Sequence, residues 1–200
     1  MATLTKTAKR SSGTSTAKKS ASSEREKGAL ATLVDKAADV VTSIMPSGRR
    51  NAIDLLKDDH ERVQSLFDQV KSSDDKRHPA LFEKIKKELD LHAHIEETIF
   101  YPKLKADGDK DLVDIVLEGI EEHRQAKMFL REIDALNADS SKFEPKLKVL
   151  MEDIEHHVKE EEGEMFPLVE DQFNADVLDD LAVEMEKEKR NFKKSLSAAA

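Results

Sequence analysis

The 200-residue sequence predicts an all-α protein: an antiparallel up-down-up-down four-helix bundle, built from a duplicated helical hairpin, with extra N- and C-terminal helices. Apolar residues recur at helical spacing along several long segments, which short polar loops separate. Glycine (6 residues) and proline (5 residues) are scarce, and this argues against an all-β fold with many tight turns. Two stretches, LHAHIEETIFYP and EHHVKEEEGEMFP, are alike, which indicates an internal repeat.

The N-terminal segment differs in composition from the rest of the chain. Residues 1–28 are rich in Ser, Thr, Ala and Lys and carry a net charge of +5, so we expect a disordered basic tail. Residues 29–46 have the spacing of a short amphipathic helix. The total charge of −9 leaves −14 on residues 29–200, and this acidic body disfavours nucleic acid as a partner of the folded part. For the tail itself, contact with nucleic acid or an anionic surface, or a role as a transit peptide, stays open.

The composition also excludes several classes of protein. Cysteine is absent, which rules out disulfides, cysteine-bound zinc, iron–sulfur ligation and thiol catalysis. No apolar run approaches the roughly 20 residues of a transmembrane helix. The N-terminus lacks the continuous apolar segment of a secretion signal. We therefore expect a cytoplasmic protein without a transmembrane segment.

Four long amphipathic segments form the predicted bundle, residues 50–171. Pro79 suits the first turn of the second helix, and Ser141 with Glu144 predicts a capping box for the fourth. Because the loops are short, consecutive helices are expected to be antiparallel neighbours. The predicted helices cover about residues 50–71, 79–104, 111–137 and 142–171, and a C-terminal helix follows over 174–197.

The repeat places histidines and glutamates at matching positions. When Pro102 and Pro167 are aligned, a histidine stands ten residues before each proline, and a glutamate follows four residues later: His92 with Glu96, and His157 with Glu161. The preceding helices match as well, each with an acid–histidine pair: Asp59-His60 and Glu122-His123. The two upstream histidines lie 32 and 34 residues before their partners, so the chain reads as a duplicated hairpin.

These six side chains are expected to converge. A histidine and a glutamate at i and i+4 share one helix face, and counting from the hairpin loops puts the four candidate histidines near one level of the bundle. Unpaired, they would cost on the order of several kcal/mol in a core, which a metal cluster would relieve. Without thiolates, a non-haem di-iron site fits best, and zinc or manganese stays open by ligand type. The candidate metal ligands are His60, His92, Glu96, His123, His157 and Glu161.

Other polar residues near the repeat receive a simpler interpretation. Glu97 and Glu162 are expected on solvated helix faces. His78 is expected in a loop or cap, and His94 and His156 fall outside the repeat register and are expected to be exposed.

The combined pattern resembles the hemerythrin-like family, the HHE cation-binding domain, through the stretches DLLKDDHERVQSLF, HAHIEETIFYP, EEHRQAKMF and HHVKEEEGEMFP. The resemblance covers about residues 50–170. It implies an antiparallel four-helix bundle with a carboxylate-bridged di-iron centre, two Fe per chain, held by the six candidate ligands. Ferritin-like oxidases use Glu-x-x-His, and no histidine of this chain has a glutamate three residues before it.

Two positions depart from the oxygen-carrying members of that family. Those proteins have a histidine four residues after the third-helix histidine and an aspartate five residues after the last one, where this chain has Lys127 and Glu162. We expect Lys127 to turn to solvent and to leave a coordination position open. An open position favours reaction with the bound ligand over reversible oxygen carriage.

The leading hypothesis is therefore a non-haem di-iron protein that binds and reacts with O2, peroxide or nitric oxide, for sensing, storage or detoxification. A redox partner would complete such a cycle, and whether turnover is catalytic stays open. One alternative is iron–sulfur cluster repair or iron donation under stress, which the lack of a cysteine module disfavours. Another is a metal-independent helical adaptor, which a metal analysis would distinguish at once.

Overall fold

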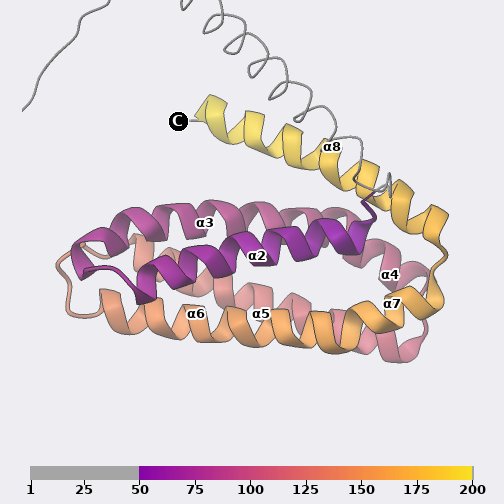
Figure 1. Cartoon of the computed structure of the whole chain (residues 1–200), viewed down its shortest axis with the longest axis horizontal. Coiled ribbons are helices and arrows are strands. Elements are labelled where there is room, and N and C mark those ends of the chain that lie inside the picture. The colour runs from indigo at the N-terminus through magenta and orange to yellow at the C-terminus, as the bar shows by residue number, and fades with distance from the viewer. Residues whose placement is uncertain (1–49, 200) are drawn as a thin grey trace, which may run out of the picture. The chain divides into compact units, whose positions relative to one another are not determined.

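The computed structural model describes residues 50–199, and these form helices with no strand. The predicted tail (1–28) and the predicted short helix (29–46) lie outside the described residues. Figure 1 shows the remaining helices as an antiparallel bundle with one further helix beside it, so the predicted fold class is confirmed. The helices are α2 (Ala52–Lys71), α3 (His78–Ile95), α4 (Tyr101–Asp107), α5 (Lys110–Asp134), α6 (Phe143–Glu160), α7 (Phe166–Gln172) and α8 (Ala175–Ala199).

In each half of the repeat, a widened π-helical turn begins at the glutamate that stands four residues after the candidate histidine. The turn η2 (Glu96–Phe100) joins α3 to α4, and η3 (Glu161–Met165) joins α6 to α7. The amide of Tyr101 donates to the carbonyl of Glu96, five residues earlier. The cause lies in the next residue, Pro102, because proline has no N–H and its ring crowds the carbonyl four residues before it. The same arrangement recurs before Pro167, so each candidate glutamate begins a turn of the kind often found at functional sites.

The helix starts agree with the prediction in one place and differ in another. Helix α2 begins with a capping box, in which the Asn51 side chain accepts from the Asp54 amide at 3.0 Å and the Asp54 side chain accepts in return at 3.1 Å. The capping box predicted from Ser141 and Glu144 was wrong, since α6 begins at Phe143 without a side-chain cap. Glu144 has a different partner, the ring of a buried histidine on α3.

That histidine is His78, the first residue of α3, which is buried where the α2–α3 connection meets α6. Its Nδ1 lies 2.7 Å from Glu144, and its Nε2 lies 3.1 Å from the carbonyl of Val70 and 3.3 Å from that of Ser73. All three partners are acceptors, so both ring nitrogens act as donors and the ring is an imidazolium. Burial opposes this charge, but the hydrogen bonds to Glu144 and to the carbonyls raise the pKa of His78 above 6.5.

We expect His78 to make the stability of the fold depend on pH. Because its pKa is raised on folding, its contribution is fully present below the unfolded value of 6.5 and is lost as the pH rises through the folded value. The variant His78→Gln should therefore lose more unfolding free energy at about pH 5.5 than at about pH 8.5, which urea titrations at both values would measure. His156→Gln is the control, because that side chain is 64% exposed. Equal losses at both pH values for His78→Gln would contradict this account.

Two apolar clusters fill the bundle on either side of a polar layer. One cluster lies toward the α2–α3 and α5–α6 connections and includes Phe67, Phe82, Ile133, Phe143 and Leu147. The other lies toward α4 and α7 and includes Leu56, Phe100, Tyr101, Leu104 and Phe166. The polar layer between them holds the predicted ligands.

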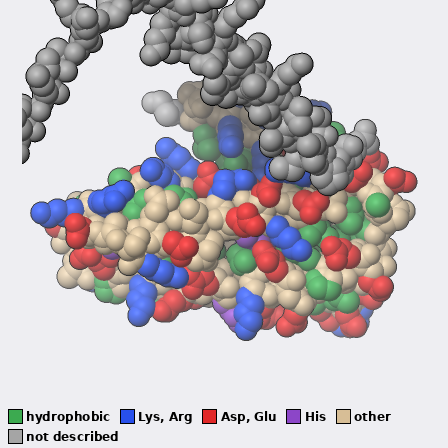
Figure 2. All heavy atoms as spheres, viewed as in Figure 1, with side chains coloured by type: hydrophobic (Ala, Val, Ile, Leu, Met, Phe, Trp, Pro, Cys, Tyr) green, Lys and Arg blue, Asp and Glu red, His purple; other side chains and the backbone are tan. Residues whose placement is uncertain are grey.

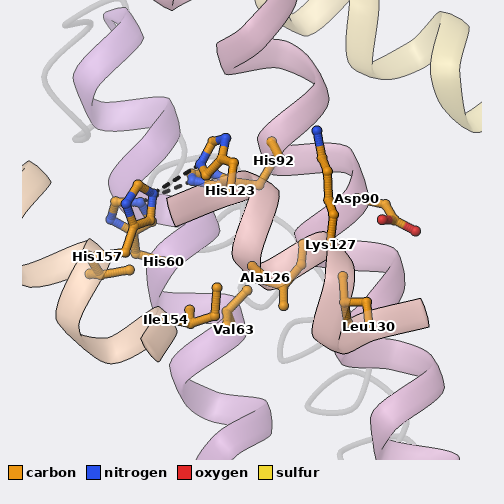
Figure 3. A pocket seen from close by; sticks show the side chains of 13 residues that line it. His60, Val63, Asp90, His92, His123, Ala126, Lys127, Leu130, Ile154 and His157 are labelled. Atoms are coloured by element: carbon orange, nitrogen blue, oxygen red, sulfur yellow. Dashed lines mark hydrogen bonds between the residues drawn. The ribbon is translucent and has the colours of Figure 1, made fainter. Parts of the chain in front are cut away.

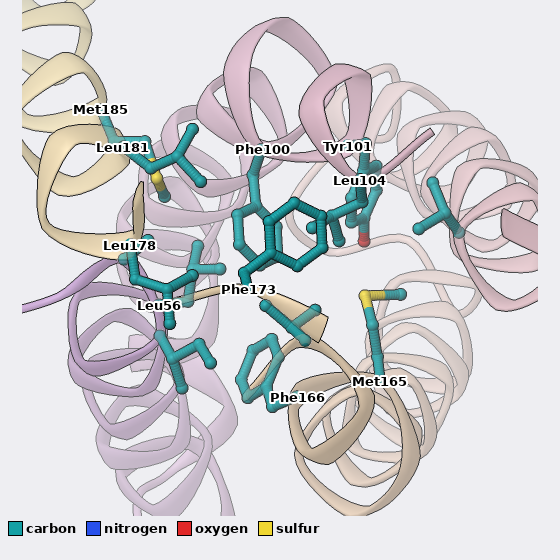
Figure 4. Packing of buried hydrophobic residues seen from close by; sticks show 14 of the residues in the cluster. Leu56, Phe100, Tyr101, Leu104, Met165, Phe166, Phe173, Leu178, Leu181 and Met185 are labelled. Atoms are coloured by element: carbon teal, nitrogen blue, oxygen red, sulfur yellow. The ribbon is translucent and has the colours of Figure 1, made fainter. Parts of the chain in front are cut away.

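Helix α8 packs against α2 and α3, outside the four-helix arrangement. Its residues Leu178, Leu181 and Met185 join the second cluster beside Leu56 and Phe100 (Figure 4). The face of the molecule seen in Figure 2 carries acidic and basic side chains interspersed with one another. Among the described residues, none of the helices has the length and apolar character needed to cross a membrane.

Candidate metal centre

The six predicted ligands come together in the polar layer, and each is at most 5% exposed. Four different helices supply the histidines, and each π-helical turn begins with a glutamate. The residues are His60 on α2, His92 on α3, Glu96 at the start of η2, His123 on α5, His157 on α6 and Glu161 at the start of η3.

The four imidazoles form two pairs, one from each hairpin (Figure 3). The Nε2 atoms of His60 and His92 are 3.3 Å apart, and those of His123 and His157 are 3.0 Å apart. All four rings therefore point the same nitrogen atom toward the centre of the bundle. The two halves of the sequence repeat thus place equivalent ring atoms at equivalent positions in the bundle.

Each glutamate lies between the two histidine pairs. Oε2 of Glu96 is 3.1 Å from Nε2 of His92 and 3.2 Å from Nε2 of His123. Oε2 of Glu161 is 3.5 Å from Nε2 of His157 and 3.2 Å from Nε2 of His60. Each carboxylate thus contacts one histidine of its own hairpin and one of the other hairpin, which is the placement that a bridging carboxylate requires.

A second set of carboxylates faces the outer nitrogens of the same rings. Three of the Nδ1 atoms have a carboxylate oxygen within hydrogen-bond distance, and the fourth, on His92, has one at 3.5 Å. Such partners fix the ring orientation and leave Nε2 free to accept a metal. The contacts from Nδ1 are His60 to Glu162 at 2.7 Å, His123 to Glu97 at 3.1 Å, His157 to Glu122 at 2.7 Å and His92 to Asp59 at 3.5 Å.

This outer ring corrects the interpretation of Glu97 and Glu162, which were expected to be merely solvated. Both are partly exposed, but each holds a histidine of the opposite hairpin. Asp59 and Glu122 carried a usable signal, because each stands directly before a candidate histidine in both halves of the repeat. Their targets, however, are histidines on the neighbouring helix, and only the packed bundle brings them together.

The arrangement fits cations better than it fits an empty core. When an Nδ1–H donates outward, the Nε2 atom of that ring carries a lone pair, so the close Nε2 pairs cannot satisfy each other. Both side-chain oxygens of Glu96 and Oε2 of Glu161 are buried without a hydrogen-bond partner. Ligand atoms of His92, Glu96, His157 and Glu161 all lie within 4.8 Å of one another, and metal ions would satisfy these groups together.

Without a metal, the pKa values of His123 and Glu96 depend strongly on the charged groups next to them. Burial disfavours a charged His123, but its contacts with Glu96 and Glu97 raise its pKa to about 9. Burial likewise disfavours a charged Glu96, yet His92 and His123 hold its pKa well below the usual range. The cluster is thus a set of carboxylates whose charge must be balanced by cations, either protons or metal ions.

Tyr101, the only tyrosine of the chain, breaks the symmetry between the two glutamates. Its hydroxyl donates to Oε1 of Glu161 at 2.7 Å, and burial raises its pKa well above the usual value, so it stays a donor. The equivalent residue in the other half is Phe166, which stacks on the His60 ring and has no donor to offer Glu96. Gly119 makes room for the tyrosine, because a Cβ atom there would lie 3.1 Å from the hydroxyl oxygen.

A small cavity adjoins the histidine side of the cluster (Figure 3). It has room of about 20 Å³, enough for roughly one water-sized molecule. All four site histidines line it, and its other walls are mainly apolar, with side chains that include Val63, Ala126, Leu130 and Ile154. A small, weakly polar ligand is the kind of molecule that such a cavity accepts.

Lys127 also lines this cavity, and its position corrects the expectation that it turns away to solvent. Its ammonium lies 2.5 Å from both carboxylate oxygens of Glu97, the residue that holds His123. The side chain is 37% exposed, so it lies at the edge of the site rather than free in solvent. Engaged with Glu97, its ammonium offers no lone pair to a metal.

Besides His78, two further histidines lie outside the cluster. His156 is 64% exposed, as the repeat register predicted, and its ring pairs with Glu160. His94 was expected to be exposed, but it is half-buried against α8. Its Nε2 lies 2.8 Å from Glu188, and its ring stacks on Phe192 with centroids 4.2 Å apart.

The fold and the cluster agree with what sequence comparison finds. Residues 51–169 match the family model of the hemerythrin HHE cation binding domain, which is more than half of the chain. The chain belongs to this family, and the resemblance seen in the sequence is confirmed. It is accordingly a helical protein with a metal-binding domain.

Individual relatives support the same assignment. A DNA nickase of Nostoc sp. is 24% identical over 180 residues, 88% of this chain and 50% of the relative. An uncharacterized hemerythrin-like protein of Schizosaccharomyces pombe is 29% identical over 118 residues, 58% of each chain. The chain thus spans about half the length of the curated relatives it matches. The crystal structure of a hemerythrin HHE cation binding domain-containing protein from Mycobacterium kansasii is similar with a TM-score of 0.62 and 26% identity, covering 72% of this chain and 88% of that chain.

Proposed function

We propose that this protein is a non-haem di-iron protein that binds and reacts with O2, peroxide or nitric oxide. The observation that carries the proposal is the position of Glu96 and Glu161, each between two histidine pairs. Two cations held by one histidine pair each would share both carboxylates, an arrangement typical of two-metal sites. Histidine and carboxylate ligands without thiolate suit iron.

Iron bound here would supply the electrons for the reaction, and the chain's own residues would prepare the site for it. The apolar wall around Val63, Leu130 and Ile154 restricts the cavity to a small ligand and keeps bulk water away. The outer carboxylates hold the imidazoles in a fixed orientation. Tyr101 holds Glu161 through one oxygen and leaves the other free for a metal.

The ligand class follows from the cavity. Room for about one water-sized molecule suits a diatomic gas or peroxide better than an organic substrate. Six protein ligands leave positions open on two six-coordinate ions, and the cavity meets the cluster at the histidines. An incoming ligand would therefore reach the ions from this side.

We expect reaction with oxygen rather than reversible carriage, because Lys127 is engaged with Glu97 and offers no lone pair to iron. Reduced, iron-loaded protein mixed with air-saturated buffer in a stopped-flow spectrometer should change directly to the spectrum of the oxidised protein. Lys127→His should slow this oxidation by about tenfold or more, the scale of effects seen when residues next to a metal site are changed. Lys84→His, at an exposed position on α3, is the matched control and should have no effect.

Oxygen that is released intact from the unmodified protein under vacuum would contradict this proposal and make the protein a carrier. Oxidation rates that are the same for the Lys127→His and Lys84→His variants would show that Lys127 has no part in controlling the site.

The name of the Nostoc relative suggests DNA cleavage as a second candidate function. Its similarity extends over 180 residues, beyond the span of the HHE domain, and residues 1–28 of this chain carry a net charge of +5 that suits a phosphate backbone. The charge of −14 on residues 29–200 opposes DNA binding by the helical part. Conversion of supercoiled plasmid to the nicked form by metal-loaded full chain, abolished in His157→Ala, would favour this second function.

A further inference from the structure

The two halves of the metal centre have equivalent inner residues but differ in what surrounds them. Asp59 and Glu122 occupy matching places in the repeat, each directly before a site histidine. Asp59 faces Nδ1 of His92, and Glu122 faces Nδ1 of His157. In the other half, Lys127 also contacts an outer carboxylate, Glu97, but it is 37% exposed and leaves the 3.1 Å hydrogen bond between Glu97 and His123 in place. The two metal positions are therefore distinguished by Asp59 and Glu122.

The neighbours of the two carboxylates have opposite charge. Asp59, which is 2% exposed, contacts the ammonium of Lys189 and the guanidinium of Arg62. Glu122 instead shares a hydrogen bond with Glu160, another carboxylate, and within residues 50–199 no lysine or arginine pairs with it. The negative charge of Asp59 is thus neutralised by the two cations next to it. The charge of Glu122 instead interacts mainly with the ring of His157.

Helix α8 brings Lys189 to this place. Ala182, Met185 and Lys189 follow each other at helical spacing on one face, and all three are buried. One turn further on, Phe192 stacks on His94 of α3, so the helix is held on both sides of Lys189. Burial and the nearby cation Arg62 lower the pKa of Lys189 to about 8, so it is mainly a cation at neutral pH.

The distances agree with a competition for Asp59. The carboxylate of Asp59 contacts the Lys189 ammonium directly, but it lies 3.5 Å from Nδ1 of His92 without a hydrogen bond. In the other half, Glu122 lies 2.7 Å from Nδ1 of His157. A histidine that donates to an anionic carboxylate is the more basic metal ligand.

We infer that Lys189 of α8 draws Asp59 away from His92 and makes the His60–His92 position the weaker of the two metal positions. The inference rests on the proposed two-metal centre and goes beyond it, since the matched family domain ends at residue 169 and α8 begins at residue 175. Helix α8 thereby acts on the centre through Asp59 and His92, and Lys189 is a positioning residue. Its cation also repels a metal ion at the nearer position.

A titration with Co²⁺, followed by its visible absorption and by competition with a chelator, tests the inference. The unmodified full chain should bind two ions per chain in two steps of different affinity. His92→Ala should abolish the weaker step, and His157→Ala should abolish the tighter one. Lys189→Met should strengthen the weaker step by about tenfold, because changes next to a metal ligand typically act on this scale.

Three further variants separate positioning from a general effect on the fold. Lys189→Arg keeps the cation and should retain the two unequal steps. Lys187→Met, at an exposed position on the same helix, should behave like the unmodified chain. Lys189→Gln repeats the test with a polar side chain in case the methionine variant does not fold.

The outcomes distinguish the inference from the proposed function. Two steps of equal affinity, or an unchanged weaker step in both neutral variants of Lys189, would overturn the inference and leave the two-metal centre intact. Fewer than two Co²⁺ ions per chain in the unmodified protein would overturn the two-metal centre itself, and the inference with it.

Discussion

Replacing Glu96 with alanine is expected to remove both metal ions from the protein. Oε2 of Glu96 lies 3.1 Å from Nε2 of His92 and 3.2 Å from Nε2 of His123, so the carboxylate belongs to both halves of the centre. Its loss would take a ligand from both ions at once and would also remove the negative charge that offsets their mutual repulsion, so neither ion should stay bound. Metal analysis of the purified variant by mass spectrometry would measure the loss, with circular dichroism to show that the helices remain.

The control for this experiment is Glu83→Ala, an exposed glutamate on α3, the helix that leads into η2. It should keep the full metal content. If Glu96→Ala retains one tightly bound ion, the carboxylate does not bridge, and the two halves of the centre are independent.

Replacing His157 with alanine is expected to have a different effect, the loss of the ion held by the His123–His157 pair. The side chain is buried, and its Nε2 belongs to one pair only. One ion should therefore remain at the His60–His92 pair. Metal content measured beside that of Glu96→Ala would distinguish a terminal ligand from a bridging one.

His156→Ala is the matched control, because the neighbouring ring points outward and is 64% exposed. Adjacent residues of a helix point about 100° apart, so only one of the two can face the core. Full metal content in His157→Ala together with metal loss in His156→Ala would place the ligand one residue away from where the structure puts it.

The fold and the six residues of the inner cluster could be predicted from the sequence because two signals agreed. Helical spacing is a strong signal over long segments, and the repeat supplied each candidate residue twice. His92 with Glu96, and His157 with Glu161, therefore supported each other, and the structure brings both pairs together with the two upstream histidines.

The residues that surround the cluster could not be predicted in the same way. The roles of Glu97 and Glu162 depend on the π-helical turns, which change the direction of the side chains that follow the two candidate glutamates. Spacing along a regular α-helix does not predict these directions. Lys127 was misread because its partner, Glu97, lies 30 residues away on another helix.

The same limit applies to contacts that reach across the fold. Glu144 had the spacing of a capping box, but a hydrogen bond to buried His78 takes its place. Lys189 stands in an ordinary charged stretch of sequence, and only the docking of α8 on α2 and α3 brings it to Asp59. Local sequence patterns identify the residues that can bind a metal. The packing of the helices determines which other residues contact those ligands.

The metal content of the unmodified protein tests the central claim most directly. The full chain, expressed in iron-replete medium and purified as a folded protein, would be measured by mass spectrometry against its protein concentration. Two histidine pairs that share two carboxylates predict two iron ions per chain. Iron content near zero, or a single tightly held zinc ion, would contradict the account.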